Sequence, residues 1–345
     1  MNSRERMMTA ITGGVPDRVP VSPWGLGKLD PRGPVAAELI KETDPFISVG
    51  IGSPYRNYGK YAEVRVEGSD TITVLHTPEG DLRQVFRRSE LTNCCIEFFC
   101  KNADDVHKYL SIPYEAPTPD LTGFFRRKDE IADEGLVLAS IPNAMCLAAE
   151  ILSPEDLCLL WADDPELLNQ LVKTGSDRLM PFVEQACRKG ADFFRVIGGE
   201  YVTEQIGPGG VPHLLTPFDT ELVKLIHSYN AYVHYHNHGN VRPYLDFFVN
   251  LGIDSLDPLE GPPFGDADLA EVKKVFKGKV CMVGNIDDME IMGKCSTAEV
   301  KAIARERVLA AGPDGFILGG TSSGTFNEHA ARNFIALVDV VKELA

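Results

Sequence analysis

Short apolar runs recur along the chain, separated by longer segments in which apolar positions have helical spacing. Apolar runs of about four to eight residues between turn signals are typical of buried strands, and apolar residues at i, i+3 and i+4 are typical of amphipathic helices. The pattern predicts strands that end near Trp24 and over 45–52, 136–142, 192–198, 231–240, 255–260, 280–287 and 315–323. It predicts helices over 3–12, 34–42, 103–109, 119–131, 144–151, 154–163, 165–189, 218–229, 241–250, 266–276, 297–310 and 327–343.

Residues 56–100 stand apart as a β-rich segment. Three β-like runs, 62–66, 71–76 and 81–87, are separated by turn residues. Outside this segment, the strands alternate with helices, as in a (β/α)8 barrel. No glycine-rich dinucleotide fingerprint opens a predicted helix, which disfavours a Rossmann sheet. The sequence therefore predicts an α/β protein that is a single TIM-barrel domain over 1–345, with a β-rich insertion after its second strand.

Charge and composition exclude several classes of partner. The formal net charge is -16 and no basic cluster is present, so a nucleic-acid partner is not expected. The chain has no run of 18 apolar residues and no signal-peptide pattern at its start, so we expect no membrane segment and a cytoplasmic location. The eight cysteines are scattered without a Cys-x-x-Cys pair, which is typical of reduced thiols.

Candidate chemistry is concentrated in the histidine-rich segment of the fifth strand. His234, His236 and His238 alternate along it and are expected to share one face, at the carboxyl end of the strand where barrel active sites lie. Glu260 closes the next predicted strand. Two neutral imidazoles and a carboxylate are a ligand set for zinc that leaves room for a further ligand. We predict His236, His238 and Glu260 as metal ligands, and the alternative is a polar strand end without a metal.

Two further residues are considered for the same site. Ser322 follows the eighth strand and is a candidate fourth metal ligand. His234 lies one layer deeper than His236 and is expected to be a core residue or to support the ligands.

Other polar and aromatic residues follow the predicted strand ends. Carboxylates and amides there can move protons or orient a substrate, and aromatic rings can line a pocket. The alternatives are solvation of a loop for Glu200, a helix cap for Asp287 and core packing for the aromatic residues. The predicted catalytic residues are Glu200, Asn285 and Asp287. The predicted substrate-binding residues are Trp24, Tyr55, Asn143 and Tyr201.

Several segments resemble, in the same order, the uroporphyrinogen decarboxylase superfamily. They are Asn2-Ser-Arg-Glu-Arg, Pro16-Asp-Arg-Val-Pro-Val, His236-Asn-His-Gly-Asn240, Gly284-Asn-Ile-Asp287 and Gly315-Phe-Ile-Leu. Within this superfamily the chain is similar to the zinc-dependent, corrinoid-linked methyltransferases. The resemblance implies a TIM barrel, an active site at the strand ends, bound zinc, and a corrinoid cofactor that we expect on a separate partner protein.

The ligand positions depart from that branch. Its metal is typically bound by a His-x-Cys pair and a later Cys, and related methionine synthases add a Glu. Here His236 matches the His, His238 stands at the first Cys position, Glu260 matches the Glu, and Thr321-Ser322-Ser323 stands near the later Cys. With both thiolates absent, the metal should be a stronger Lewis acid for oxygen. The arginine-rich opening of the decarboxylases corresponds to Ser22-Pro-Trp-Gly-Leu-Gly, which disfavours porphyrinogen decarboxylation.

We therefore expect a zinc-dependent methyltransferase that moves a methyl group from a small methylated substrate to a corrinoid on a partner protein. The substrate that we favour is an O-methyl ether. Corrinoid-to-thiol transfer, a zinc-dependent lyase or hydrolase, a decarboxylase and a metal-free binding protein remain alternatives. The methyl donor, the direction of transfer, the identity of the metal and assembly into a homo-oligomer are left open by the sequence.

Overall fold

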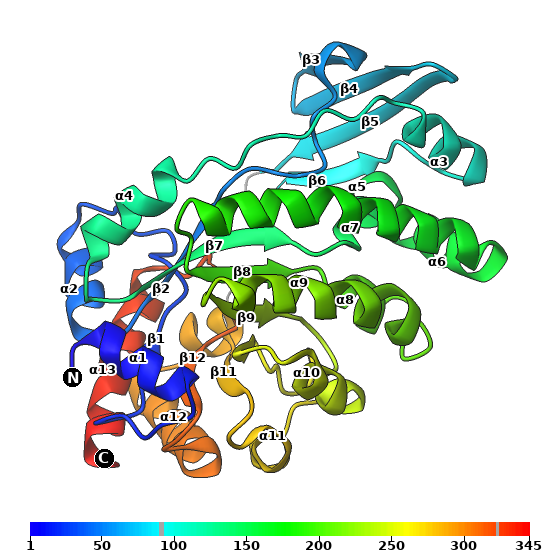
Figure 1. Cartoon of the computed structure of the whole chain (residues 1–345). Helices are drawn as coiled ribbons and strands as arrows, with labels where there is room; N and C mark the ends of the chain where they lie inside the picture. The colour runs from blue at the N-terminus through cyan, green and yellow to red at the C-terminus, as the bar shows by residue number, and fades with distance from the viewer. Residues whose placement is uncertain (90–92, 322–323) are drawn as a thin grey trace.

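Strands and helices alternate through most of the protein (Figure 1). The computed structural model describes residues 1–89, 93–321 and 324–345. The strands of the main sheet are β1 (Val21–Ser22), β2 (Phe46–Gly50), β7 (Leu136–Pro142), β8 (Phe193–Ile197), β9 (Tyr232–His236), β10 (Ser255–Asp257), β11 (Cys281–Ile286) and β12 (Phe316–Gly320). The helices are α1 (Ser3–Ile11), α2 (Pro34–Glu42), α3 (Ala103–Leu110), α4 (Thr122–Ile131), α5 (Cys146–Ile151), α6 (Pro154–Asp163), α7 (Pro165–Arg188), α8 (Glu200–Thr203), α9 (Thr216–Ser228), α10 (Leu245–Leu251), α11 (Leu269–Phe276), α12 (Thr297–Ala311) and α13 (Glu328–Glu343). Short 3-10 and π-helical turns are η1 (Gly59–Tyr61), η2 (Val211–Leu215), η3 (Arg242–Tyr244) and η4 (Asp288–Met292).

The main sheet is a closed barrel of parallel strands. Its order is β1-β12-β11-β10-β9-β8-β7-β2. A further parallel bridge pairs Trp24, just beyond β1, with Phe46 of β2 and joins the two ends of the sheet. The predicted TIM-barrel fold is therefore confirmed. Helix α13 packs against α2 beside this seam, and Figure 1 shows the two chain termini on the same side of the molecule.

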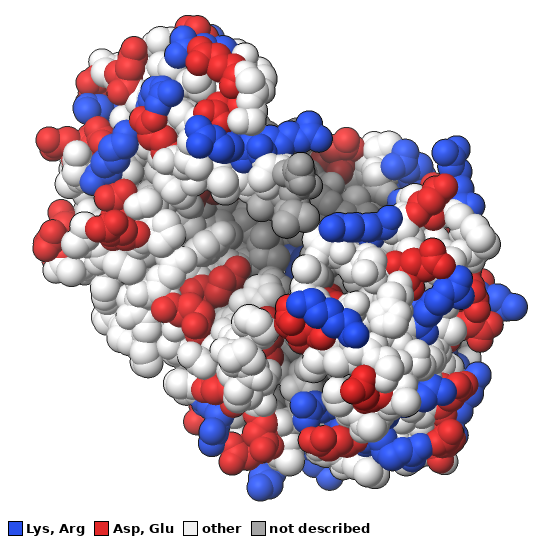
Figure 2. All heavy atoms as spheres, turned by 180° about the vertical axis from the view of Figure 1, so that it is seen from behind, with Lys and Arg blue, Asp and Glu red and all other residues white. Residues whose placement is uncertain are grey.

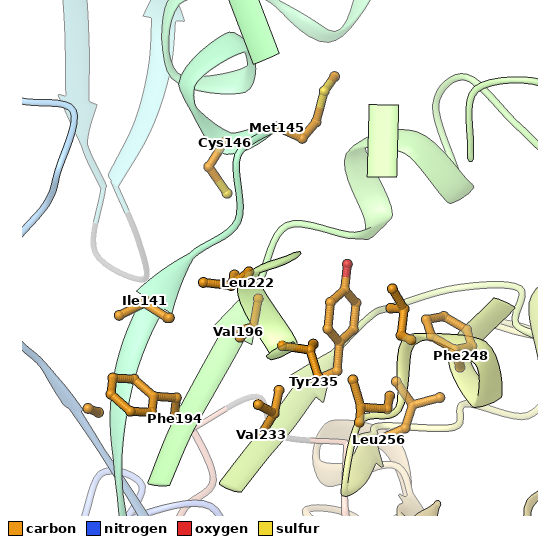
Figure 3. Packing of buried hydrophobic residues seen from close by; sticks show 14 of the residues in the cluster. Ile141, Met145, Cys146, Phe194, Val196, Leu222, Val233, Tyr235, Phe248 and Leu256 are labelled. Atoms are coloured by element: carbon orange, nitrogen blue, oxygen red, sulfur yellow. The ribbon is translucent and has the colours of Figure 1, made fainter. Parts of the chain in front are cut away.

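The barrel strands are apolar because both of their faces are covered. Every residue of β11 and β12 is buried. Outward side chains pack on the surrounding helices: Figure 3 shows Tyr235 of β9 beside Phe248 of α10, and their ring centroids are 5.8 Å apart. Within the described ranges, no helix is long and apolar enough to cross a bilayer.

Apolar side chains fill the amino-terminal end of the barrel interior. Helix α1 closes this end with three buried residues, Met7, Ala10 and Ile11. They form one cluster with inward-facing residues of the strands and their ends, namely Trp24, Phe46, Leu136, Leu138, Phe193, Cys281, Val283 and Ile317. Because this end is plugged, the interior is accessible from the carboxyl ends of the strands, where barrel sites lie.

The β-rich insertion is a four-stranded antiparallel sheet. Its strands are β3 (Ala62–Glu67), β4 (Asp70–Thr77), β5 (Gly80–Arg88) and β6 (Asn93–Glu97), hydrogen-bonded in that order. The sequence pattern predicted only the first three, because the polar and cysteine-rich β6 has no strand periodicity and owes its conformation to pairing with β5. Arg56 Nε pairs with Glu150 Oε2 of α5 at 2.9 Å, and Gln84 Nε2 donates to the Glu150 carbonyl oxygen at 2.9 Å. Since α5 follows β7, the insertion lies at the carboxyl-end rim of the barrel, as Figure 1 shows.

A buried carboxylate ties the start of the chain to the barrel. Asp44, which has no exposed side-chain surface, accepts hydrogen bonds from Arg6 Nη1 of α1 and from Arg18 Nη1, each at 2.7 Å. Its Oδ2 also accepts from the backbone N–H of Val21 at 2.9 Å. This contact explains the opening motifs in physical terms, because it holds α1 against β1 and the barrel floor.

Replacing Asp44 by asparagine should destabilise the protein strongly. The Asp44→Asn change leaves the partly buried guanidinium of Arg18 without its counter-charge and that of Arg6 with Asp17 alone, which costs on the order of 3 kcal/mol in the free energy of unfolding. Urea unfolding followed by circular dichroism measures the change. The matched control is Asp177→Asn, which removes an exposed pair with Lys173 on α7 and should leave the free energy of unfolding almost unchanged. An equal effect in both variants would contradict this account.

Candidate active site

The histidine segment leaves the barrel at the carboxyl end of β9. His234 and His236 face the interior, whereas Tyr235 between them faces the outer helices. The strand ends at His236, so His238 lies in the following loop. The prediction that all three histidines share one strand face is therefore wrong for His238. The chain turns after His236, and Asn237 is hydrogen-bonded to Thr203 at the end of α8.

Asp257, at the end of β10, joins the two inward histidines. Its Oδ1 accepts from Nε2 of His234 at 2.6 Å and from Nδ1 of His236 at 2.9 Å. The side chains of Asp257 and His234 have no exposed surface, and that of His236 is 8% exposed. Nδ1 of His234 lies 2.8 Å from Oγ of Ser255. An ionised carboxylate can only accept, so both ring nitrogens that face Asp257 carry protons.

Burial and pairing set the charge of this cluster. Burial lowers the pKa of His234, which keeps the ring neutral at neutral pH. Burial alone would raise the pKa of Asp257, but the pull of His236 and His234 outweighs it and holds that pKa well below its usual range. Asp257 thus remains a carboxylate and selects the Nδ1–H tautomer of His236. In that tautomer Nε2 carries the lone pair that a metal would take.

Glu260 follows β10 and faces the loop that contains His238. Its Oε1 is 3.1 Å from Nδ1 of His238, and its Oε2 accepts from the backbone N–H of Gly239 at 2.9 Å. The hydrogen bond with Glu260 raises the pKa of His238. The ring centroids of His236 and His238 are 4.5 Å apart, with the planes at 88°. The two histidines and the glutamate predicted as ligands therefore lie together at one point of the rim.

The donor chemistry at this point suits zinc. Imidazole nitrogens and a carboxylate are normal zinc ligands, and a carboxylate behind the ligating ring, as Asp257 is behind His236, is the usual supporting contact. Over residues 1–89, 93–321 and 324–345, no three His, Cys, Asp or Glu side chains converge at ligand distance. Glu260 is instead hydrogen-bonded to His238, so metal binding requires this bond to open. Ser322, the further predicted ligand, lies outside the described residues.

Glu200 and Tyr201 open the short helix α8, which the sequence pattern did not predict. Oε2 of Glu200 is buried and has no hydrogen-bond partner in the part of the chain that the structure describes. After Glu260, Glu200 is among the carboxylates that raise the pKa of His238, so it lies near the metal candidates. Tyr201 lines a cavity of about 260 Å³ with Arg56 and Glu150, and burial raises its pKa to about 12. Figure 2 shows the hollow between the insertion and the barrel body.

The other two residues predicted to be catalytic follow β11. Asn285 is 7% exposed, and its Oδ1 is buried without a hydrogen-bond partner among the described residues. Asp287 instead caps the turn η4, because its side chain accepts from the backbone N–H groups of Met289 and Glu290. The structure thus shows the helix-cap alternative for Asp287. A catalytic role remains a prediction for both residues.

The residues predicted to bind substrate are mostly buried. Trp24 is 5% exposed and stacks on Phe46 with ring centroids 4.8 Å apart. Tyr55 is 1% exposed and donates its hydroxyl to the carbonyl oxygen of Asn143 at 2.7 Å. Asn143 is fully buried at the end of β7. These contacts stabilise the barrel wall, and substrate contact by these residues remains a prediction.

Comparison with known families decides the assignment. The family model described as Uroporphyrinogen decarboxylase (URO-D) matches residues 125–344. The chain belongs to this family. Among solved structures, a methyltransferase from Methanosarcina mazei has a TM-score of 0.66 at 12% identity, covering 100% of this chain and 99% of that chain. A B12-independent methionine synthase from Shewanella sp. W3-18-1 has a TM-score of 0.44 at 10% identity, covering 83% of this chain and 76% of that chain. A search of curated proteins gives no match. At these identities the structural likeness concerns the fold, and the reaction of this URO-D family member is a separate question.

A second polar cluster of this URO-D barrel was missed from the sequence. Asp219 lies in the first turn of α9, is 1% exposed, and accepts from Tyr235 Oη at 2.6 Å and from Asn143 Nδ2 at 3.1 Å. Its Oδ1 is buried without a partner in the described ranges. Burial raises the pKa of Asp219 from 3.8 to about 6. An aspartate in a first helical turn gives no sign of burial in the sequence, because that position is common on exposed helices.

Asp219 should make the stability pH-dependent. Because its folded-state pKa exceeds its unfolded value, its contribution to stability is fully present below about pH 4 and is lost as the pH rises through about 6. The free energy of unfolding of the wild type, minus that of Asp219→Asn, should therefore fall by about 1 kcal/mol between about pH 5 and about pH 8. Urea unfolding of both proteins at a series of pH values measures this difference. A difference that does not change with pH would refute the assignment.

Proposed function

We propose that this chain is a zinc-dependent methyltransferase that moves a methyl group from a small O-methyl ether to a corrinoid on a partner protein. The observation that supports this best is the carboxylate of Asp257, which holds His236 in the tautomer of a metal ligand at the mouth of a URO-D barrel. His238 and Glu260 stand beside it as two further candidate donors, once the hydrogen bond between them opens.

The donor set favours an oxygen-centred substrate. Two neutral imidazoles and one carboxylate cancel only part of the charge of a divalent ion, so the metal keeps a positive net charge. Zinc held by His236, His238 and Glu260 would supply a Lewis acid for the departing oxygen, and a corrinoid on the partner would supply the methyl acceptor. A thiol acceptor would favour a softer, sulfur-rich site, which makes the corrinoid-to-thiol direction the weaker candidate.

Residues of the chain would bind the metal, fix the orientation of a ligand, transfer a proton and orient the substrate. His236 and His238 provide nitrogens and Glu260 a carboxylate, while Asp257 prevents rotation of the His236 ring. Glu200, whose Oε2 has no hydrogen-bond partner among the described residues, lies near His238 and is the candidate to pass a proton to the departing oxygen. Asn285, whose Oδ1 near the end of β11 has no hydrogen-bond partner within the described ranges, orients the substrate through its amide.

The zinc-loaded protein should transfer a methyl group from at least one of a panel of methyl ethers to reduced free cobalamin. His236→Ala, His238→Ala and Glu260→Ala should each lower the bound zinc and slow the transfer about 100-fold or more, because each removes a ligand. The cobalamin absorption spectrum gives the rate, and elemental analysis of the same untagged samples gives the zinc content.

The matched control is His76→Ala, which removes an exposed histidine of the insertion that pairs with Asp81. It should keep both the zinc and the activity. Methyl transfer at the full rate by metal-free protein would overturn the proposal. Release of an alcohol without cobalamin would identify a hydrolase instead, and release of carbon dioxide a decarboxylase.

A further inference from the structure

Arg195 places a positive charge inside the barrel. It lies on β8 two residues after Phe193, which belongs to the interior cluster, so both side chains point inward. Phe194, between them, faces the opposite way and belongs to the core cluster outside the barrel. The guanidinium carbon of Arg195 lies 4.7 Å from the centroid of the Trp24 ring.

Polar residues surround Arg195 on this side of the barrel wall. In register, Arg195 pairs with Ser140 on β7 and with His234 on β9. Ser140 follows the inward-facing Leu138 by two residues and is half-buried. On β2, Ser48 follows the inward-facing Phe46 in the same way and is exposed. The inner wall formed by β2, β7 and β8 is therefore polar and open to the barrel mouth above the apolar floor.

Among the described residues, the charge of Arg195 lies over the Trp24 ring and pairs with no carboxylate. Across the described ranges Arg195 forms no ion pair, and its Nε is buried without a hydrogen bond. Two further donors, Ser22 Oγ of β1 and Trp24 Nε1 just beyond it, are also buried without partners in these ranges. Arg195 is only partly exposed, so a charge there without a counter-charge has a cost, and an unpaired buried donor adds to that cost. The group that this wall lacks is an acceptor with negative charge.

We infer that Arg195 binds an anionic group of the substrate, so that the substrate is a methylated carboxylic acid. The planar guanidinium presents paired donors that match a carboxylate. His234 is the register partner of Arg195. His236 lies two residues beyond His234, so it is about 7 Å further along β9. A small molecule can therefore place its carboxylate on Arg195 and its ether oxygen beside His236. This location of the ether rests on the proposed function, whereas recognition of the carboxylate does not require methyl transfer.

If Arg195 has a purely structural role, a different binding result is expected. Arg195 lies close enough to His234 to lower the pKa of that ring, after the larger effect of burial, so it could act only on the charge balance around Asp257. In that case the protein would not distinguish a carboxylate from its neutral amide. Binding of matched acids and amides therefore separates the two roles.

The test is titration calorimetry of the protein with methoxyacetate and 4-methoxybenzoate, and with the corresponding amides. At least one acid should bind the wild type about 10-fold or more tightly than its amide. Arg195→Gln should weaken the binding of that acid about 100-fold and leave the amide unchanged, because only the acid loses a charged contact. Arg126→Gln, on the exposed face of α4, is the matched control and should bind like the wild type.

Equal affinity for acid and amide, no binding of either acid, or wild-type binding by Arg195→Gln would overturn the inference. If Arg195→Gln does not fold, Arg195→Lys decides: it keeps the charge without the paired donors, and its affinity for the acid should fall about 10-fold. The titrations contain no cobalamin. Acid binding that depends on Arg195, together with no methyl transfer from any ether, would refute the proposed function and leave this inference standing.

Discussion

A single carboxylate, that of Asp257, is shared by two imidazole rings inside the barrel, and the arrangement of the site depends on this contact. Asp257 has no exposed surface, so its charge is tolerated only because His234 and His236 both donate to it. The same bonds lock β9 to β10 and determine which nitrogen of His236 can bind a metal. The barrel floor below is apolar and plugged by α1, which confines charged groups to the carboxyl-end half.

Most of the fold could be predicted because its elements are determined locally. The strand β7 has the predicted bounds, since Leu136–Pro142 is a continuous apolar run between polar segments. The elements that the sequence pattern did not predict are those whose conformation depends on distant parts of the chain. The strand β6 exists through its pairing with β5, and α8 is a single turn held over the barrel rim. Neither has enough length or periodicity to be recognised alone.

The candidate site could be predicted in part. The alternation of His234 and His236 with Tyr235, and the position of Glu260 after the next strand, were sufficient to bring these side chains to one point of the rim. The role of Asp257 was not predicted, because an aspartate before a proline is typical of the end of a strand. Its hydrogen bonds join it to His236 and His234, which lie 21 and 23 positions away in the sequence. Arg195 was missed because an arginine in an apolar strand does not reveal that it points inward. These properties depend on strand register, which no local pattern specifies.

X-ray absorption at the zinc edge of the zinc-loaded protein tests the central claim most directly, since it reports the atoms bound to the metal. The account predicts a shell of nitrogen and oxygen at about 2.0 to 2.1 Å with the multiple scattering of two imidazoles, and loss of one imidazole in His236→Ala. A sulfur shell at about 2.3 Å, or a spectrum that His236→Ala leaves unchanged, would contradict it.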